Sequence, residues 1–253
     1  TDTASVPAAD VREIKIDWVS GSIDVRVGTG DDVTFYETSS RTLTDAQKMR
    51  YSLSTSGVLQ ISFREDVDNI FNWFSVDSNM PSKALVVEVP ASLAGQLDKL
   101  DIDNVSARIE VNGVCGDKTG IDSVSGQISC VDLTCDELEL SSTSGSIDCE
   151  NCTADQIELN NVSGSMRVEG DFRDVQVETV SGSAKISCQI RQAMSGSAMR
   201  SITLCARSPY FVSWRRARQA VFTLLPPSSD IAASVTAWWL VVMAASSWSH
   251  SSS

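Results

Sequence analysis

A five-residue pattern that recurs at nearly constant spacing is the feature that most constrains how this chain can fold. The pattern is an apolar residue or Thr, then Ser, then Gly or Ala, then a polar residue, then an apolar residue. Its copies begin at Val105, Val124, Thr143, Val162 and Val180, and an earlier copy begins at Val19. The last five copies are 19, 19, 19 and 18 residues apart. Such regularity does not arise by chance, so the chain is predicted to be a repeat protein.

Each repeat also has an internal period of two, which predicts β-strands. We call the first residue of each pattern position 0. Apolar residues then recur at positions −5, −3, 0, +4 and +6, which in the fourth repeat are Ile157, Leu159, Val162, Met166 and Val168. This spacing predicts two short strands whose inward side chains share one core, and it excludes a helix. The polar residues at position −1 are predicted to face solvent: Asn104, Ser123, Ser142, Asn161 and Thr179.

The Ser-Gly step between the two strands is expected to supply a bend, because Gly tolerates positive φ and a Ser hydroxyl can bond nearby backbone. One repeat is too thin to enclose a core, so neighbouring repeats must stack, at about 4.8 Å per rung. The predicted fold is therefore all-β: a parallel β-solenoid, similar to a β-helix, with rungs of about 19 residues over residues 97–190.

Residues 1–96 are predicted to form a first rung followed by an irregular β cap. Residues 11–27 have the apolar spacing of the array, whereas residues 33–36, 51–63 and 84–89 have the patterns of ordinary strands. We expect this region to cover the open end of the array, because an exposed sheet end invites aggregation.

Three aromatic residues within that region, Phe71, Trp73 and Phe74, stand in a polar loop. They are the candidate residues for contact with a partner, which could be a glycan, a protein or a lipid surface. The competing interpretation is that they pack onto the cap.

Residues 191–253 are an atypical tail with a different composition. Residues 1–188 contain 14 Lys and Arg against 32 Asp and Glu, whereas residues 189–253 contain six Arg and a single acid, Asp230. Met194 to Ala198 resembles a further copy of the pattern, but it follows the previous copy by only 14 residues. The repeat is therefore expected to end near residue 190.

Two interpretations of this tail stay open. A membrane anchor would use residues 231–248, which are uncharged and mostly apolar and follow Arg215, Arg216 and Arg218. Alternatively, a frameshift near the end of the array would make the tail out-of-frame translation. The codons for residues 238–244 permit this, because a displaced frame allows a Gly-Asp turn of the kind that β-repeats use.

Composition excludes several classes of function. The net charge of −13 argues against nucleic acid as a partner, because binding to phosphates depends on clustered Lys and Arg. The only histidine, His250, lies in a Ser-rich terminal stretch, so triads and metal sites that need histidine have no material elsewhere. We expect no cofactor and no catalytic residues.

Cysteines and paired acids offer the remaining candidates for chemistry. Cys149 and Cys152 have the spacing of a metal or redox pair, but they occupy core positions +6 and +9, which favours buried thiols. Cys130 and Cys149 should stack on adjacent rungs, although parallel neighbours seldom give the dihedral angle of a disulfide. The pairs Glu137 with Glu139 and Asp31 with Asp32 could serve glycoside hydrolysis or bind Ca²⁺, but a charged outer face is the favoured interpretation.

The chain resembles the bacterial putative-adhesin family of β-strand-repeat domains of unknown function. The resemblance rests on residues 16–23 (Ile-Asp-Trp-Val-Ser-Gly-Ser-Ile), on residues 86–90 (Val-Val-Glu-Val-Pro) and on the repeated Val-Ser-Gly-Ser-Ile turns, and it extends over about residues 11–190. It implies a β-solenoid displayed on the bacterial cell envelope or outside the cell, often tethered by a membrane segment elsewhere in the protein. It carries no catalytic residues.

The predicted function is a non-enzymatic structural or adhesive module at the cell surface, which binds an unknown surface ligand or protein partner through an extended face. A carbohydrate-active β-helix enzyme with grouped acids is one alternative, by analogy of fold alone. An extracytoplasmic scaffold or sensor domain of a membrane-anchored protein is another.

Overall fold

The computed structural model describes residues 2–64, 82–189, 201–206, 211–212 and 219–225. The chain is all-β, as predicted, and its other regular elements within those ranges are two three-residue 3-10 helices, η1 (Ala8–Asp10) and η2 (Asp45–Gln47). The strands before the array are β1 (Asp2–Pro7), β2 (Glu13–Trp18), β3 (Gly21–Gly28), β4 (Asp32–Ser39), β5 (Arg50–Leu53), β6 (Val58–Ser62) and β7 (Lys83–Pro90). Those of the array are β8 (Leu97–Asn104), β9 (Arg108–Asn112), β10 (Gly116–Ser123), β11 (Ile128–Val131), β12 (Thr134–Ser142), β13 (Ile147–Asn161), β14 (Ser165–Thr179) and β15 (Ser183–Gln189). The tail contributes β16 (Ser201–Ala206), β17 (Phe211–Val212) and β18 (Gln219–Leu225).

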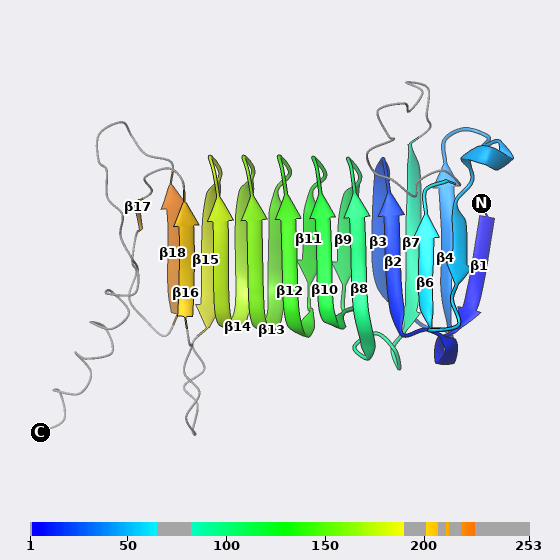
Figure 1. Ribbon diagram of the computed structural model, residues 1–253, viewed down its shortest axis with the longest axis horizontal. Coiled ribbons are helices and arrows are strands. Elements are labelled where there is room, and N and C mark those ends of the chain that lie inside the picture. Colours follow the sequence, from blue (N-terminus) through cyan, green and yellow to red (C-terminus); the bar gives the residue numbers. More distant parts are fainter. Residues whose placement is uncertain (1, 65–81, 190–200, 207–210, 213–218, 226–253) are drawn as a thin grey trace, which may run out of the picture.

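The strands form two layers that follow the long axis of the molecule (Figure 1). Layer A has the order β5–β6–β2–β8–β10–β12–β13–β14–β16, and layer B has the order β1–β4–β7–β3–β9–β11–β13–β14–β15–β18–β17. The long strands β13 and β14 belong to both layers, and the register between them shifts between Cys149 and Cys152, where β13 passes from layer B to layer A. The chain therefore visits each layer once in every repeat.

Strand pairing follows the sequence period. Ile121 pairs with Leu140 and Leu140 with Leu159 in layer A, and Ile128 pairs with Ile147 in layer B, so that partners are 19 residues apart. All of the pairs among β8 to β15 are parallel. Equivalent positions of successive repeats consequently form straight columns along the molecule.

Residues 13–28 stack directly on the first repeat of the array. Ile16 pairs with Ile102 and Ile23 with Ile109, in parallel and 86 residues apart, which is also the separation of Val19 from Val105. Beyond them the regularity is lost, because β1 with β4, β4 with β7 and β5 with β6 are antiparallel pairs. Residues 51–63, predicted as a single strand, instead contain a turn, since β5 and β6 are joined by residues 54–57.

Four of the five apolar positions face the core, as predicted. Positions −5, −3, +4 and +6 are buried in every repeat of the array, with Thr119 as the one polar member. In the fourth repeat they are Ile157, Leu159, Met166 and Val168, none more than 2% exposed. Apolar burial of this extent is the main source of stability of the array.

The predicted orientation of positions 0 and −1 is wrong. Val124, Val162 and Val180, at position 0, are largely exposed, although Val19 and Val105 at the same position are buried. The polar residues at position −1 are all buried: Asn104, Ser123, Ser142, Asn161 and Thr179. The physical reason is that strand alternation continues from −5 and −3 to −1, so the side chain at −1 points inward and the one at 0 points out.

The tail strands depart from the 19-residue period. Strand β16 pairs in parallel with β14 and joins residues 27 apart, such as Val175 and Ile202, whereas β18 runs antiparallel to β15. Among the described residues no helix has the length and apolar character to cross a membrane. The anchor candidate, residues 231–248, lies outside the described residues.

Candidate functional site

The turns of the array line up along one long edge of the molecule (Figure 1), and the buried residue at position −1 builds each of them. Its side-chain oxygen accepts a hydrogen bond from the backbone N–H at position +2. In the third repeat Gly145 N donates to Ser142 Oγ at 2.9 Å, and in the fifth Gly182 N donates to Thr179 Oγ1 at 3.1 Å. The buried polar column is thus satisfied by the turns that it closes.

The repeated glycines are required by close stacking and not by positive φ, which corrects the expectation from sequence. Positive φ occurs at Gly21, Gly57 and Gly113 among the described glycines, but not at position +2 of the array. A Cβ on Gly145 would instead lie 1.9 Å from the carbonyl oxygen of Gly126, and one on Gly164 would lie equally close to Gly145 O. From Gly126 to Gly182, successive turns therefore sit too close together for a side chain at this position, whereas the first repeat of the array carries Ala107 there.

The serine at position +1 ties each turn to the preceding one. Ser144 donates its backbone N–H to Val124 O at 2.9 Å and its hydroxyl to the same oxygen at 3.2 Å. Ser163 and Ser181 make the equivalent pairs of bonds to Thr143 O and Val162 O. The turns are consequently held in a rigid, evenly spaced row.

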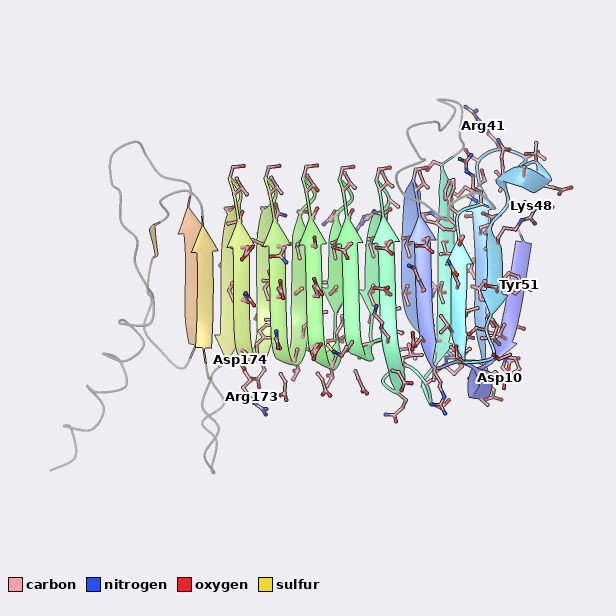
Figure 2. All side chains as sticks on the ribbon, viewed as in Figure 1. Asp10, Arg41, Lys48, Tyr51, Arg173 and Asp174 are labelled. Atoms are coloured by element: carbon pink, nitrogen blue, oxygen red, sulfur yellow. The ribbon has the colours of Figure 1, made fainter. Side chains whose placement is uncertain are left out.

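An apolar ridge runs along the tips of these turns. We define the turn ridge as the exposed residues at position 0: Val124, Thr143, Val162 and Val180. The three valines are 43%, 44% and 43% exposed, and they are three of the five large hydrophobic residues that the described surface exposes most. Figure 2 shows side chains projecting from the tip of every turn in this row. This row of exposed apolar side chains is a candidate interaction surface.

A groove of about 280 Å³ lies beside the turn ridge. Its lining includes Thr143, Val162 and Val180 from the ridge, and Ser141, Asn160 and Glu178 from position −2 of the same repeats. The −2 residues pair in register, Asp122 with Ser141, Ser141 with Asn160 and Asn160 with Glu178. The groove therefore separates an apolar column from a parallel column of hydrogen-bonding groups.

Layer A carries an acidic column toward its N-terminal end. Asp17, Asp103 and Asp122 pair in register on β2, β8 and β10, and Lys15 Nζ lies 3.3 Å from Asp103 and 3.6 Å from Asp17. Burial, reinforced by the charge of Asp103, raises the pKa of Asp17 despite the hydrogen bond from Gln60. Neighbouring carboxylates repel one another when both are charged, so the charge of Asp103 favours the protonated form of Asp17.

Two neighbouring acids of layer A behave similarly. Burial, followed by the charges of Asp103 and Asp101, raises the pKa of Asp122. Burial and the charge of Glu158 raise the pKa of Glu139. Asp17, Asp122 and Glu139 thus hold their protons more tightly than isolated carboxylates would.

The structure places the other predicted candidates as follows. Phe71, Trp73 and Phe74 lie outside the described residues. Glu137 and Glu139 are on the outer face of β12, where Glu137 Oε2 pairs with Lys118 Nζ at 2.7 Å. Asp31 and Asp32 are exposed where the loop after β3 leads into β4. Within the described residues no group of three or more His, Cys, Asp or Glu side chains could hold a metal ion.

The cysteines lie in the core, in agreement with their repeat positions. Cys149 and Cys152 are buried, and Cys149 is the in-register partner of Cys130 on the adjacent strand. Five cysteines are free thiols: Cys115, Cys130, Cys135, Cys149 and Cys152. Hydrogen bonds that the Cys149 thiol donates to Cys130 and Cys152, together with burial, raise the pKa of Cys149. Burial raises the pKa of Cys135 to about 12.

The turn ridge and the column of residues at position −2 were not predicted from the sequence, because position 0 was assigned to the core. The signal was present: Thr143 stands at position 0 where a buried site would take an aliphatic residue, and every residue at −1 can accept a hydrogen bond. Small polar residues directly before a Ser-Gly turn are typical of a side chain that closes the turn.

Comparison with known proteins gives one family match and one structural match. No curated protein sequence matches the chain. A crystal structure described as that of a "putative cell adhesion protein" from Clostridium sporogenes aligns with a TM-score of 0.46 and 8% sequence identity, covering 81% of this chain and 98% of the other. The family model described as Toastrack DUF4097 matches residues 11–197, which is most of the chain. The chain belongs to the Toastrack DUF4097 family.

Proposed function

We propose that this chain is a non-enzymatic structural or adhesive module of the bacterial cell surface, which binds a surface ligand or protein partner through an extended face. In this proposal residues 97–190 are a parallel β-solenoid with rungs of about 19 residues. Residues 1–96 supply a first rung and a cap, and residues 191–253 are an atypical tail, either the product of a frameshift or a membrane anchor. The family to which the chain belongs is one of unknown function, so the proposal rests on the surface itself.

The observation that carries the proposal is the exact register of the repeats. Parallel pairing at a 19-residue offset places the same position of every repeat in one column, as Asp122, Ser141 and Asn160 illustrate. The hydrogen bonds at positions −1 and +1 fix the turns between the columns. A rigid surface that repeats along its length suits attachment, because binding does not require the surface to become ordered first.

A carbohydrate-active enzyme is the second candidate, and the raised pKa values on layer A favour it. An acid that keeps its proton near neutral pH can donate it to a leaving group, and Asp17, Asp122 and Glu139 are shifted in that direction. Asp17 itself is buried and accepts a hydrogen bond from Gln60 at 3.0 Å, an arrangement that serves folding equally well.

Attachment to whole bacterial cells and to their isolated envelopes tests the proposal. Fluorescently labelled chain should be retained on one of these surfaces to an extent that depends on its concentration. Both the chain and the envelope polymers should then be recovered chemically unchanged. Retention on none of them would contradict an adhesive function. Release of soluble reducing sugars from the envelopes, lost in Asp122→Asn, would instead establish the enzyme.

A further inference from the structure

The exposed valines of the turn ridge have no role in holding the fold together. The core of the array is complete without position 0, because positions −5, −3, +4 and +6 fill it and position −1 closes the turn. Val124, Val162 and Val180 nevertheless present branched aliphatic side chains to solvent at the tips of rigid turns. Their orientation is imposed by the backbone, so their exposure is permanent rather than transient.

The dimensions of the turn ridge exclude a globular protein as its occupant. The ridge is one side chain wide and, at about 4.8 Å per repeat, spans about 14 Å from Val124 to Val180. A stable protein interface buries roughly 800 Å² on each partner, which is far more than this strip offers. A linear polymer that follows the ridge needs no such area, because contacts to successive units add along its length.

The spacing of the columns distinguishes between linear polymers. Side chains on one face of an extended peptide repeat about every 6.7 Å, so a peptide strand would fall out of step with rungs about 4.8 Å apart. A pyranose unit in an extended polysaccharide is close to one rung in length. Each unit can then meet the same two groups of one repeat, the residue at position 0 and the residue at position −2.

The chemistry of the two columns matches that of a pyranose ring. Such a ring has a face of C–H groups and an edge of hydroxyls. The C–H face can pack on Val162 and Val180, while the hydroxyls can donate to oxygens across the groove, such as those of Ser141 and Glu178. The acidic column and the net charge of −13 oppose an anionic polymer, and the uncharged side chains of Ser141 and Asn160 in the groove match the hydroxyls of a neutral one.

We propose that the turn ridge and the groove beside it bind a neutral, linear polysaccharide that runs along the axis of the array. This inference deepens the proposed function and rests on it, since it names the class of ligand that the extended surface takes. The ligand lies between positions 0 and −2 of the last three repeats, which line the groove, with one sugar unit for each repeat.

Depletion of the full chain from solution by insoluble cellulose and by chitin tests the proposal, with the anionic polymer alginate as comparison. The chain should bind at least one of the two neutral polymers, and not alginate. The double variant Val162→Ser with Val180→Ser should bind at least tenfold more weakly. Val27→Ser is its matched control, because Val27 is 42% exposed but lies on β3, away from the ridge, and that variant should bind as the wild type does.

A second pair of variants tests the −2 column. Glu178→Ala should weaken binding several-fold, whereas Glu169→Ala, which removes an exposed acid from the layer B part of the same strand, should leave it unchanged. Affinity for soluble oligosaccharides of the polymer that binds should rise up to about three units and then level off, because three repeats line the groove. Circular dichroism melting curves should confirm that all four variants are folded.

Three results would overturn the inference. The first is no binding to either neutral polymer, and the second is equal binding by the ridge variants and the wild type. The third is a dimer, seen by sedimentation, that the ridge variants abolish, because the ridge would then be occupied by a second copy. Retention on whole cells tests the adhesive function separately. In each of the three cases, retention of the ridge variants on cells would support that function, and failure of the wild type to be retained would contradict it.

Discussion

The ammonium of Lys83 lies 2.7 Å from the carboxylate of Glu37, and neither side chain is more than 2% exposed. The same ammonium donates to the carbonyl oxygens of Gln47 and Phe63 and lies 4.0 Å from the centroid of the Phe63 ring. The other oxygen of Glu37 accepts the backbone N–H of Met49. A single buried ion pair thus joins β4 and β7 to the segments that follow β4 and β6.

Removing one partner of this ion pair should destabilise the protein strongly. Glu37→Gln leaves the ammonium of Lys83 buried without a counter-charge, and we expect a loss of about 3–5 kcal/mol in the free energy of unfolding, measured with urea. Glu88→Gln is the matched control. Its partner, Arg26, is partly exposed, so breaking their 2.8 Å contact should cost no more than about 1 kcal/mol. Equal effects of the two substitutions would show that burial of the Lys83 pair has no energetic consequence.

Adding a methyl group at a stacked glycine should disrupt the array. A Cβ at residue 145 would overlap Gly126 O, so Gly145→Ala should lower the free energy of unfolding by about 1–3 kcal/mol or more. Gly95→Ala provides the comparison, because no heavy atom lies within 4 Å of the Cβ that it adds. Thermal unfolding of both variants would check this, and an unchanged melting temperature for Gly145→Ala would contradict the close stacking.

Substitutions at two adjacent residues of one turn should differ sharply in their effect on stability. Ser142→Ala removes the buried acceptor of the Gly145 N–H, and the unpaired donor should cost about 1–3 kcal/mol. Thr143→Ala changes the adjacent, exposed side chain and should stay within about 0.5 kcal/mol. Chemical denaturation of the two variants distinguishes the orientation found in the structure from the one predicted from sequence, which requires the reverse order.

The buried acid of layer A should make stability depend on pH in a defined direction. Because the pKa of Asp17 is raised in the folded protein, the native state binds its proton more tightly than the unfolded state does. The contribution of Asp17 to the free energy of unfolding therefore falls as pH rises from the ordinary aspartate value through the raised one. Asp17→Asn should remove this part of the pH dependence, as seen by urea unfolding across acidic to neutral pH. A steeper decline of the free energy of unfolding with rising pH in Asp17→Asn would contradict the assignment of this pH dependence to Asp17.

The core cysteines should be unreactive until the protein unfolds. Cys149 is buried and its pKa is raised, so that little thiolate is present and reagents cannot reach it. In a variant that retains Cys130 and Cys149 as its only cysteines, a chromogenic thiol reagent should react slowly in buffer and at once in denaturant. Fast reaction in buffer would place these thiols at the surface. The same variant under oxidising conditions shows whether the in-register pair can form a disulfide.

The amino-acid sequence by itself determined the repeat, its 19-residue period and the columns that follow from it. A β-strand period of two on either side of a turn leaves parallel stacking as the way to bury residues such as Ile157 and Met166. The burial of Cys149 follows from its position in the repeat. The structure of the irregular region before the array was harder to predict from the sequence. Its antiparallel strand pairs and the buried ion pair of Lys83 with Glu37 join residues that no local pattern relates.

Only the tertiary structure decided which side of each turn faces solvent. Hydrophobicity alone places Val162 inside and Asn161 outside, and the folded chain does the opposite. Asn161 points inward because strand alternation carries it there and because its oxygen accepts the Gly164 N–H, while Gly164 packs against the preceding turn. Hydrogen bonding and close stacking therefore outweigh the burial of Val124, Val162 and Val180, and they leave the turn ridge exposed.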